Sequence, residues 1–520
     1  AQRGFLGCGV MALDVAEKNG ESLSDSEVKD ILKRADLEEK DAESFEGQGG
    51  ICVVIAVAIF SSLAGLLMGL DIGYIAGVKS MKTFAHDLLQ HDGLMELEDS
   101  VITMIFGLGA VLAAFPPVMQ ACVSALGRKG AVVAGGWFFC LGAALQCAAM
   151  NLAMMLLGRL TSGFSVGLLS GNAPVYTSEI APPAVRGALV MGFQFAVTVG
   201  IMLAFLLALV LEDVEDPISG WRWVIAAQIV PGSLLLILGA FMPGSPRHLL
   251  ANGKIREALQ TLRKLRREDV SFELAQIYLE YEASSEASWL DFLTGDNGKL
   301  LRIGVMIQIL AQICGMNAFM YHGPVIFKLI FQSDHAGLLF TVVSGVVNIV
   351  ATIPALLVVD RYGRTFLMKW SALGMMSCSA VLAAVGDICL QGEDFTCGDW
   401  ARATCTVAIC GFILNFAYGW GGMPWLYCSE IFPQKYRTKG AGATTDAAWV
   451  GNILIAFVPP LMFAHWGFDT FWVFVGTNAL CLWVALILPE TKDKSLEEIR
   501  DMLNAWLSQS WKVRWFKINF

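Results

Sequence analysis

Two charged residues stand alone inside long apolar stretches of this sequence. Asp71 is the single charge in IAVAIFSSLAGLLMGLDIGYIAGV, and Arg159 is the single charge in MMLLGRLTSGF. A charged side chain is expensive to place in the lipid core of a membrane, so such residues mark a functional site by default. At a rise of about 1.5 Å per residue, both residues fall about 10 Å below the same membrane surface, so they can form an ion pair.

An ion pair between Asp71 and Arg159 suggests proton chemistry. The guanidinium stabilises the ionised carboxylate, and a conformational change that loosens the pair favours protonation of Asp71. Asp71 would then carry a proton across the membrane, with Arg159 as its counter-charge. The alternative is a permanently ionised pair that only tethers two helices.

Six side-chain amides form a second group of polar residues within apolar stretches. Gln308 and Gln312 lie four residues apart on one face of a helix, and Gly315 loosens that helix before Asn317. An amide donates and accepts hydrogen bonds, which suits sugar hydroxyls, while an indole offers a face to the C–H surface of a sugar ring. A lone amide in a membrane helix more often joins two helices. The other candidates for such a pocket are Gln194, Asn348, Asn452 and Trp425.

These residues need membrane helices to position them. The chain is 56% hydrophobic and 16% charged, with a mean hydropathy of +0.59, whereas soluble domains are about 25% charged. Apolar runs of about 20 residues are long enough to cross a bilayer, and they must be helices because lipid leaves no partner for an open sheet edge. Twelve such runs are expected, beginning near Ile51, Val101, Ala131, Leu152, Ala188, Trp223, Ile303, Leu338, Phe366, Ala403, Gly440 and Thr470.

The distribution of Lys and Arg predicts the orientation. The connections after the even-numbered spans are basic, so they and both termini are expected in the cytoplasm. Amphipathic helical patterns follow the sixth span and the last one. We therefore expect a cytoplasmic segment at 1–50, a six-helix bundle at 51–242, a cytoplasmic helical linker at 243–301, a second six-helix bundle at 302–489 and a cytoplasmic tail at 490–520.

A short motif occurs twice, as SEIAPPAVR at 178–186 and SEIFPQKYR at 429–437, at the ends of the fourth and tenth spans. The repeat predicts two similar six-helix halves, the arrangement in which two bundles rock about a central site. The charges at these helix ends can form a cytoplasmic latch that breaks and reforms. A plainer alternative is that they orient loops, because exposed ion pairs contribute little. The expected latch residues are Arg128, Glu179, Arg186, Asp360, Arg364, Glu430 and Arg437.

The sequence resembles the sugar porters of the major facilitator superfamily over about residues 51 to 500. The motifs that carry the resemblance are GRLTSGFSVG, PVYTSEIAPPAVRG, DRYGR at 360–364, QICGMNAFMYHGP at 312–324, GMPWLYCSEIFP at 422–433 and PETKDKSLEEI at 489–499. It implies the major facilitator fold with twelve transmembrane helices in two pseudo-symmetric bundles. It also implies proton coupling through an aspartate at the position of Asp71, and sugar binding by the amides and Trp425 named above.

Several positions depart from the family pattern. Ser124 and Gly244 stand where the family usually has acidic residues, so the latch of the first half is expected to be weaker or asymmetric. Ala311 replaces the first of two adjacent glutamines, and Ala448 occupies an often polar position. Where many members have two tyrosines at the outer gate, this chain has Tyr321 and His322.

Most of the thirteen cysteines lie in apolar spans, where small core side chains are expected. Cys389 and Cys397 flank an acidic outer loop, where a disulfide is an open alternative. No metal-ligand spacing or catalytic set occurs, so we expect no cofactor, no metal and no enzymatic activity. The net charge of −10 arises mostly from the N-terminal segment and outer loops, so no nucleic-acid partner is expected.

The sequence therefore predicts a plasma-membrane hexose transporter that works by alternating access, with sugar and protons moving together. We expect a monomer in the lipid bilayer, with a small sugar and protons as its partners. A facilitative sugar uniporter is the alternative, and a membrane sugar sensor is a further one. The short tail after Pro489 argues against the sensor.

Overall fold

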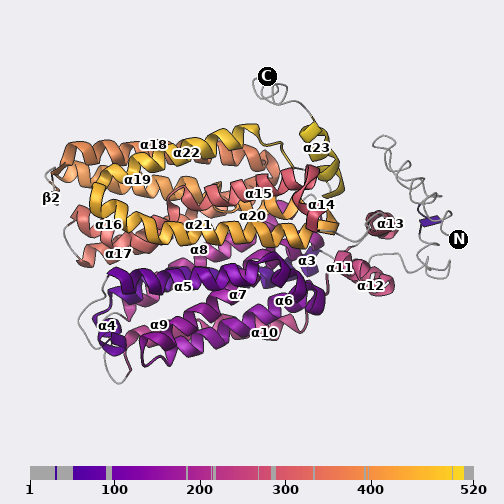
Figure 1. The fold of residues 1–520 in the computed structure, drawn as a ribbon, viewed down its shortest axis with the longest axis horizontal. Coiled ribbons are helices and arrows are strands. Elements are labelled where there is room, and N and C mark those ends of the chain that lie inside the picture. The colour runs from indigo at the N-terminus through magenta and orange to yellow at the C-terminus, as the bar shows by residue number, and fades with distance from the viewer. Residues whose placement is uncertain are drawn as a thin grey trace.

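The computed structural model describes residues 28, 30–31, 51–89, 96–182, 185–211, 214, 218–266, 269–282, 289–331, 334–391, 394–395, 398–492, 494 and 496–508. These residues are helical apart from turns and one small sheet, in which β1 (Leu390–Gln391) pairs antiparallel with β2 (Asp394–Phe395). The helices form two bundles that lie side by side along the molecule (Figure 1). The all-α membrane fold expected from the sequence is thus confirmed.

The first half of the chain forms one bundle, indigo to magenta in Figure 1. Within it α3 packs along α8, and α7 packs against α5 and α6. The helices of this bundle are α3 (Ile51–Ser80), α4 (Lys82–Leu89), α5 (Glu96–Ala114), α6 (Pro116–Cys147), α7 (Leu152–Ile180), α8 (Arg186–Val210), α9 (Gly220–Ala227) and α10 (Ile229–Gly239).

The second half forms the other bundle, in which α18 packs against α19 and α22. Short 3-10 turns, η3 (Gln434–Tyr436) and η4 (Gly467–Asp469), precede its last two long helices. The helices are α15 (Gly295–Ile313), α16 (Met316–Phe331), α17 (Asp334–Tyr362), α18 (Arg364–Cys389), α19 (Asp399–Tyr418), α20 (Met423–Glu430), α21 (Arg437–Trp466) and α22 (Thr470–Ile487). The two bundles meet mainly where α17 lies on α8 and α21 lies on α5.

Eleven helices in the described part of the chain are long and apolar enough to cross a membrane. The expected second span is divided, because α5 supplies only a shorter apolar stretch, Ser100–Ala114, and α6 continues the chain from Pro116. Helix α6 then includes the expected third span beyond a bend at Gly127, whose φ of 74° lies in the left-handed region. The eleven long helices and the shorter apolar stretch in α5 therefore correspond to the twelve expected runs.

Five further helices lie at one end of the bundles (Figure 1). We call this the inner end, because the sequence predicts that it faces the cytoplasm, and the opposite end, with α4 and the β-hairpin, the outer end. Arg266 ties these helices to the first bundle by donating to the carbonyl of Ile180 at 2.8 Å. The helices are α11 (Pro246–Ala251), α12 (Ile255–Leu265), α13 (Ser271–Glu282), α14 (Trp289–Leu293) and α23 (Leu496–Ser508).

The predicted N-terminal segment, 1–50, lies largely outside the described residues. Val28 and Ile31 are described, and both are buried against apolar side chains of α12 and α13. At the outer end, Cys389 is disulfide-bonded. Its predicted partner, Cys397, lies outside the described residues.

Candidate functional site

Asp71 and Arg159 meet in the interior of the first bundle. Nη1 of Arg159 lies 2.8 Å from Oδ1 of Asp71, and both residues are 1% exposed. The same nitrogen donates to the hydroxyl of Tyr74 at 2.7 Å, and Nε donates to the carbonyl of Ile102 at 2.9 Å. The guanidinium also lies 4.9 Å from the ring centre of Phe106. The buried arginine therefore has hydrogen-bond and aromatic partners besides the carboxylate.

The helices set the depth at which this pair forms. Helix α7 begins at a side-chain cap, where Oδ1 of Asn151 accepts from the backbone N–H of Met154 at 2.9 Å. Arg159 follows two turns later, which places it about 12 Å inside the helix start at about 1.5 Å per residue. Gly69, two residues before Asp71, packs so closely on the carbonyl of Val197 that no larger residue fits, which holds α3 against α8.

One oxygen of the carboxylate is not used by this pair. Oδ2 of Asp71 is buried and makes no hydrogen bond within the described residues. A buried acceptor without a partner is costly in an apolar interior, and protonation removes that cost by removing the charge.

A small cavity lies between the two bundles and is lined by residues of both. Six of the seven predicted sugar-binding residues line it, namely Gln194, Gln312, Asn317, Asn348, Trp425 and Asn452. The seventh, Gln308, is fully buried one turn away from Gln312 and does not line the cavity. Ala311 and Ala448, two of the departures from the family pattern, both line it.

The amides of the cavity bind one another. Oε1 of Gln312 accepts from Nδ2 of Asn317 at 2.6 Å and from Nδ2 of Asn452 at 3.3 Å. The hydroxyl of Tyr321 donates to Oδ1 of Asn452 at 3.0 Å. Oδ1 of Asn348 is buried and accepts no hydrogen bond from the described residues. Hydroxyls of a small molecule could replace the amide pairs and donate to Asn348.

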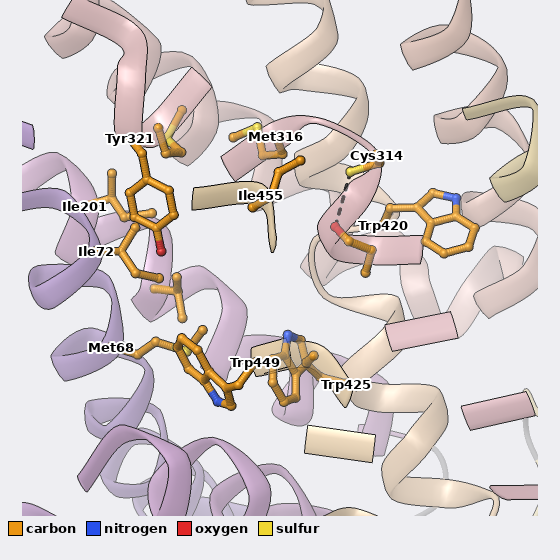
Figure 2. Close-up of a cluster of buried hydrophobic side chains, with 14 of the residues drawn as sticks. Met68, Ile72, Ile201, Cys314, Met316, Tyr321, Trp420, Trp425, Trp449 and Ile455 are labelled. Carbon is orange, nitrogen blue, oxygen red and sulfur yellow. Dashed lines mark hydrogen bonds between the residues drawn. The ribbon is translucent and has the colours of Figure 1, made fainter. Parts of the chain in front are cut away.

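Aromatic rings connect the cavity with the ion pair. The indole of Trp449 lines the cavity and packs edge-on against Phe106, with ring centres 5.5 Å apart, and Phe106 is the ring beside Arg159. Trp425 contributes a second indole, and Figure 2 shows Trp425 and Trp449 on the same side of a cluster that also contains Met68 and Tyr321. Trp449 also joins the two bundles, because its Nε1 donates to the hydroxyl of Ser170 at 3.1 Å.

The predicted outer gate lies beyond a break in the seventh span. Gly315 separates α15 from α16 with a φ of 111°, and a side chain there would meet the ring of Phe474 at 2.9 Å. Glycine is therefore required at this position. On α16, Tyr321 is buried and bound to Asn452, whereas the neighbouring His322 is half-buried.

The predicted latch residues of the first bundle gather around Glu179 at the inner end. Nη2 of Arg128 lies 3.0 Å from Oε1 of Glu179, and Nη1 of Arg437, from the second bundle, lies 3.9 Å from the same oxygen. The hydroxyl of Ser245 donates to Oε2 of Glu179. Arg186 donates instead to the carbonyl of Lys494 at 3.2 Å.

In the second bundle the corresponding group is centred on Glu430. Its Oε1 lies 3.0 Å from Nη2 of Arg364, and its Oε2 accepts from the hydroxyl of Thr491 at 2.8 Å. Asp360 lies 3.1 Å from Nη1 of Arg364 and also accepts from the backbone N–H of Ala188 in the first bundle at 2.8 Å. The latch residues thus connect the two bundles at the inner end.

Sequence reasoning missed three residues of this region. Tyr74 and Phe106 contact Arg159, but aromatic residues in apolar helices are indistinguishable from core residues by sequence. Asp446 lies in the apolar α21, and its Oδ1 is buried without a hydrogen-bond partner in the described residues. A lone acid in an apolar run was the signal that could have found Asp446.

The family profile described as "Sugar (and other) transporter" matches residues 57–503. The chain belongs to the sugar porter family of the major facilitator superfamily. This sugar porter is 31% identical over 487 residues to "Sugar transport protein 12" of Arabidopsis thaliana, covering 90% of this chain and 93% of the relative. It is 33% identical over 463 residues to the "Galactose-proton symporter" of Escherichia coli (strain K12), covering 87% and 95% respectively.

The sugar porter fold agrees with a solved structure. The proton:xylose symporter XylE bound to 6-bromo-6-deoxy-D-glucose superimposes with a TM-score of 0.77 at 25% identity, covering 87% of this chain and 99% of XylE. The protein is therefore a multi-pass membrane transporter for sugars and not an enzyme.

Proposed function

We propose that this sugar porter moves a monosaccharide, most naturally a hexose, together with protons by alternating access. The observation that carries the proposal is the buried Asp71–Arg159 pair with one carboxylate oxygen left without a hydrogen bond. A carboxylate in that setting is able to take up and release a proton as the pair loosens and closes. Asp71 is the proton carrier and Arg159 its counter-charge.

The position of the pair relative to the cavity supports coupling between proton and sugar. Phe106 lies against both Arg159 and the cavity residue Trp449. Tyr321 is bound to Asn452 in the cavity, and its helix α16 packs on α3, which carries Asp71. A sugar that displaces these side chains would therefore disturb the surroundings of Arg159. The names of the two relatives, a galactose-proton symporter and a proton:xylose symporter, agree with this coupling.

The lining of the cavity supports a monosaccharide as the substrate. Amides from both bundles, Gln194 on one side and Gln312, Asn317, Asn348 and Asn452 on the other, present donors and acceptors to a molecule held between them. The indole of Trp425 offers an apolar face to the ring. The plasma membrane is the proposed location, with both termini in the cytoplasm and a monomer as the working unit. Inward transport is favoured there because the membrane potential contributes about 2.3 kcal/mol per charge per 100 mV.

Replacement of Asp71 tests the proton role. Asp71→Asn should retain sugar exchange but lose accumulation against a gradient, because the amide cannot carry a proton. The measurement is uptake of labelled sugars in vesicles with an imposed pH gradient, with and without a protonophore. Asp399→Asn is the matched control, because it removes an exposed aspartate at the start of α19 without touching Arg159, and it should retain accumulation. Unchanged accumulation by Asp71→Asn would show that Asp71 is not the proton carrier, and wild-type uptake indifferent to the gradient would establish a uniporter instead.

Replacement of Trp425 tests the position of the sugar. Trp425→Ala should weaken sugar binding at least tenfold, because stacking and packing contacts worth about 1.4 kcal/mol or more are lost. Sugar binding to the purified protein is measured by calorimetry or by competition with a labelled sugar, because neither method relies on tryptophan fluorescence. An unaltered affinity would place the sugar elsewhere.

A further inference from the structure

Tyr74 has no assigned part in carrying the proton or binding sugar, yet it touches the centre of the proton site. It lies one turn beyond Asp71 on α3 and is 1% exposed. Its phenol oxygen accepts a hydrogen bond from Nη1 of Arg159 at 2.7 Å, and that same nitrogen lies 2.8 Å from Oδ1 of Asp71. Tyr74 and Asp71 therefore share a single guanidinium nitrogen.

A closed ring of hydrogen bonds holds Tyr74 in place. The phenol donates to Oε1 of Gln146 on α6. Nε2 of Gln146 donates to the hydroxyl of Ser162 on α7 at 3.1 Å. That hydroxyl in turn donates to the backbone carbonyl of Arg159 at 3.2 Å. Gln146 and Ser162 are both fully buried. A satisfied polar network of this kind fixes one geometry of its members.

The other elements around Arg159 contribute few titratable groups. Helix α5 supplies the carbonyl of Ile102 and the ring of Phe106. Helix α16 packs on α3 and carries Tyr321, whose hydroxyl donates to Asn452. Helix α8 packs on α3 beside Asp71 through Ile201, which does not titrate. Among the described titratable side chains, Asp71 and Tyr74 are the ones that hydrogen-bond to Nη1 of Arg159.

We infer that Tyr74 is a positioning residue of the proton site, which keeps the guanidinium of Arg159 in place while Asp71 gains and loses its proton. The inference rests on the proposed proton symport. When Asp71 becomes neutral, its attraction for Arg159 weakens, and the phenol remains as an acceptor for the same nitrogen. Without the phenol, Nη1 of Arg159 keeps only its contact with Asp71, so the guanidinium is no longer held when that carboxylate becomes neutral. The balance between the charged and neutral forms of Asp71 then changes, and with it the pH at which transport runs.

Tyr74→Phe tests this role, because it removes only the hydroxyl. The pH of half-maximal sugar uptake should shift by about one pH unit, the change expected for the loss of one hydrogen bond to a charged group. Gln146→Met should shift this pH by less, because the phenol is freed from Gln146 but remains as an acceptor for Arg159. The matched control is Tyr427→Phe in the second bundle, whose equally buried phenol donates to the carbonyl of Pro489 at 3.1 Å. Tyr427→Phe should leave the pH of half-maximal uptake unchanged.

The possible failures are distinguishable. Proton uptake with sugar is first measured on the wild type, as alkalinisation of the medium when sugar is added. Its absence would overturn the proposed symport and the role of Tyr74 together. If the wild type co-transports protons but Tyr74→Phe only lowers the amount of protein or the maximal rate, Tyr74 is structural and the inference is wrong. If Tyr74→Phe does not reach the membrane, Gln146→Met decides, and an unchanged half-maximal pH overturns the inference.

Discussion

The inner ends of the two bundles carry the same hydrogen-bonded group with different charges. In each, a buried glutamate lies 3.0 Å from an arginine, Glu179 with Arg128 and Glu430 with Arg364. In each, a hydroxyl two residues after a proline donates to the glutamate, Ser245 to Glu179 and Thr491 to Glu430. In each, a buried tyrosine donates to the carbonyl of that proline. The duplicated motifs in the sequence therefore correspond to duplicated contacts.

The two groups differ in their additional acids. In the second bundle Asp360 and Glu490 add carboxylates, and Glu490 accepts from the backbone N–H groups of Arg364 and Thr365. The corresponding positions of the first bundle hold Ser124 and Gly244. As a result, Arg364 lies within ion-pair distance of two carboxylates, whereas Glu179 lies within ion-pair distance of two arginines, one of them from the other bundle.

The two groups make different contacts with the opposite bundle. In the group around Arg364, Asp360 accepts a hydrogen bond from the backbone N–H of Ala188 in the first bundle. The group around Glu179 draws its second arginine, Arg437, across the interface. We therefore expect that separation of the bundles at the inner end weakens the first group more than the second.

The largest expected difference comes from neutralising each glutamate in turn. Glu179→Gln leaves Arg128 buried without its carboxylate, and breaking a buried pair in this way costs about 3–5 kcal/mol. Glu430→Gln should cost less, because Arg364 retains Asp360. Thermal unfolding of the purified variants and their sugar uptake would show the order. Equal losses for the two variants would contradict the asymmetry.

A smaller effect is expected from the contact that crosses the interface in the other direction. Asp360→Ala removes the acceptor for the N–H of Ala188, a charge-assisted hydrogen bond worth about 1.5–3 kcal/mol. The closed inner end should become less stable, so the sugar affinity measured from outside should fall by about tenfold. Asp360→Asn keeps an acceptor oxygen and should restore part of that affinity. No difference between alanine and asparagine would show that the hydrogen bond does not hold the inner end closed.

The smallest effect is expected from supplying the missing acid. A side chain at Gly244 would meet Leu249 at 3.4 Å, an ordinary contact, so Gly244→Glu should be tolerated. By analogy with Glu490 the new carboxylate should stabilise the start of the helix segment that begins at Arg128, by about 0.3–1 kcal/mol. The melting temperature should rise by a few degrees, and Gly244→Gln should give less. A lower melting temperature with both variants would mean that the site has no room.

The sequence predicted the ion pair because a lone charge in an apolar helix is rare and needs a partner. It placed the latch charges at the helix ends, but it did not predict their partners. Glu179 binds Arg128 and Arg437, and Arg186 binds a backbone carbonyl, because the packing between helices decides which long side chain reaches which acceptor. Gln308 shares a helix face with Gln312, but helical periodicity does not tell how far along the helix the cavity extends. Gln308 lies one turn from Gln312 and outside the cavity.

Tyr74 shows a further limit of sequence reasoning. Hydropathy treats a buried tyrosine as an apolar residue, although its hydroxyl competes for Arg159 in the folded protein. Helix α6 shows a similar limit, because the positive φ of Gly127 bends it and no composition window detects a bend. The overall fold was predictable since length, hydropathy and the repeat are properties of whole helices.

The glycine that divides the seventh span has a consequence for the timing of transport. Tyr321 and His322 of the outer gate lie on α16, whereas Gln312 of the cavity lies on α15, and Gly315 separates the two helices. A rotation of the backbone at Gly315 can therefore open the outer gate while α15 keeps its position. We expect the outer gate to open quickly and at a low cost in free energy. Breaking the ion pairs of the latch at the inner end is then the slow step of each transport cycle.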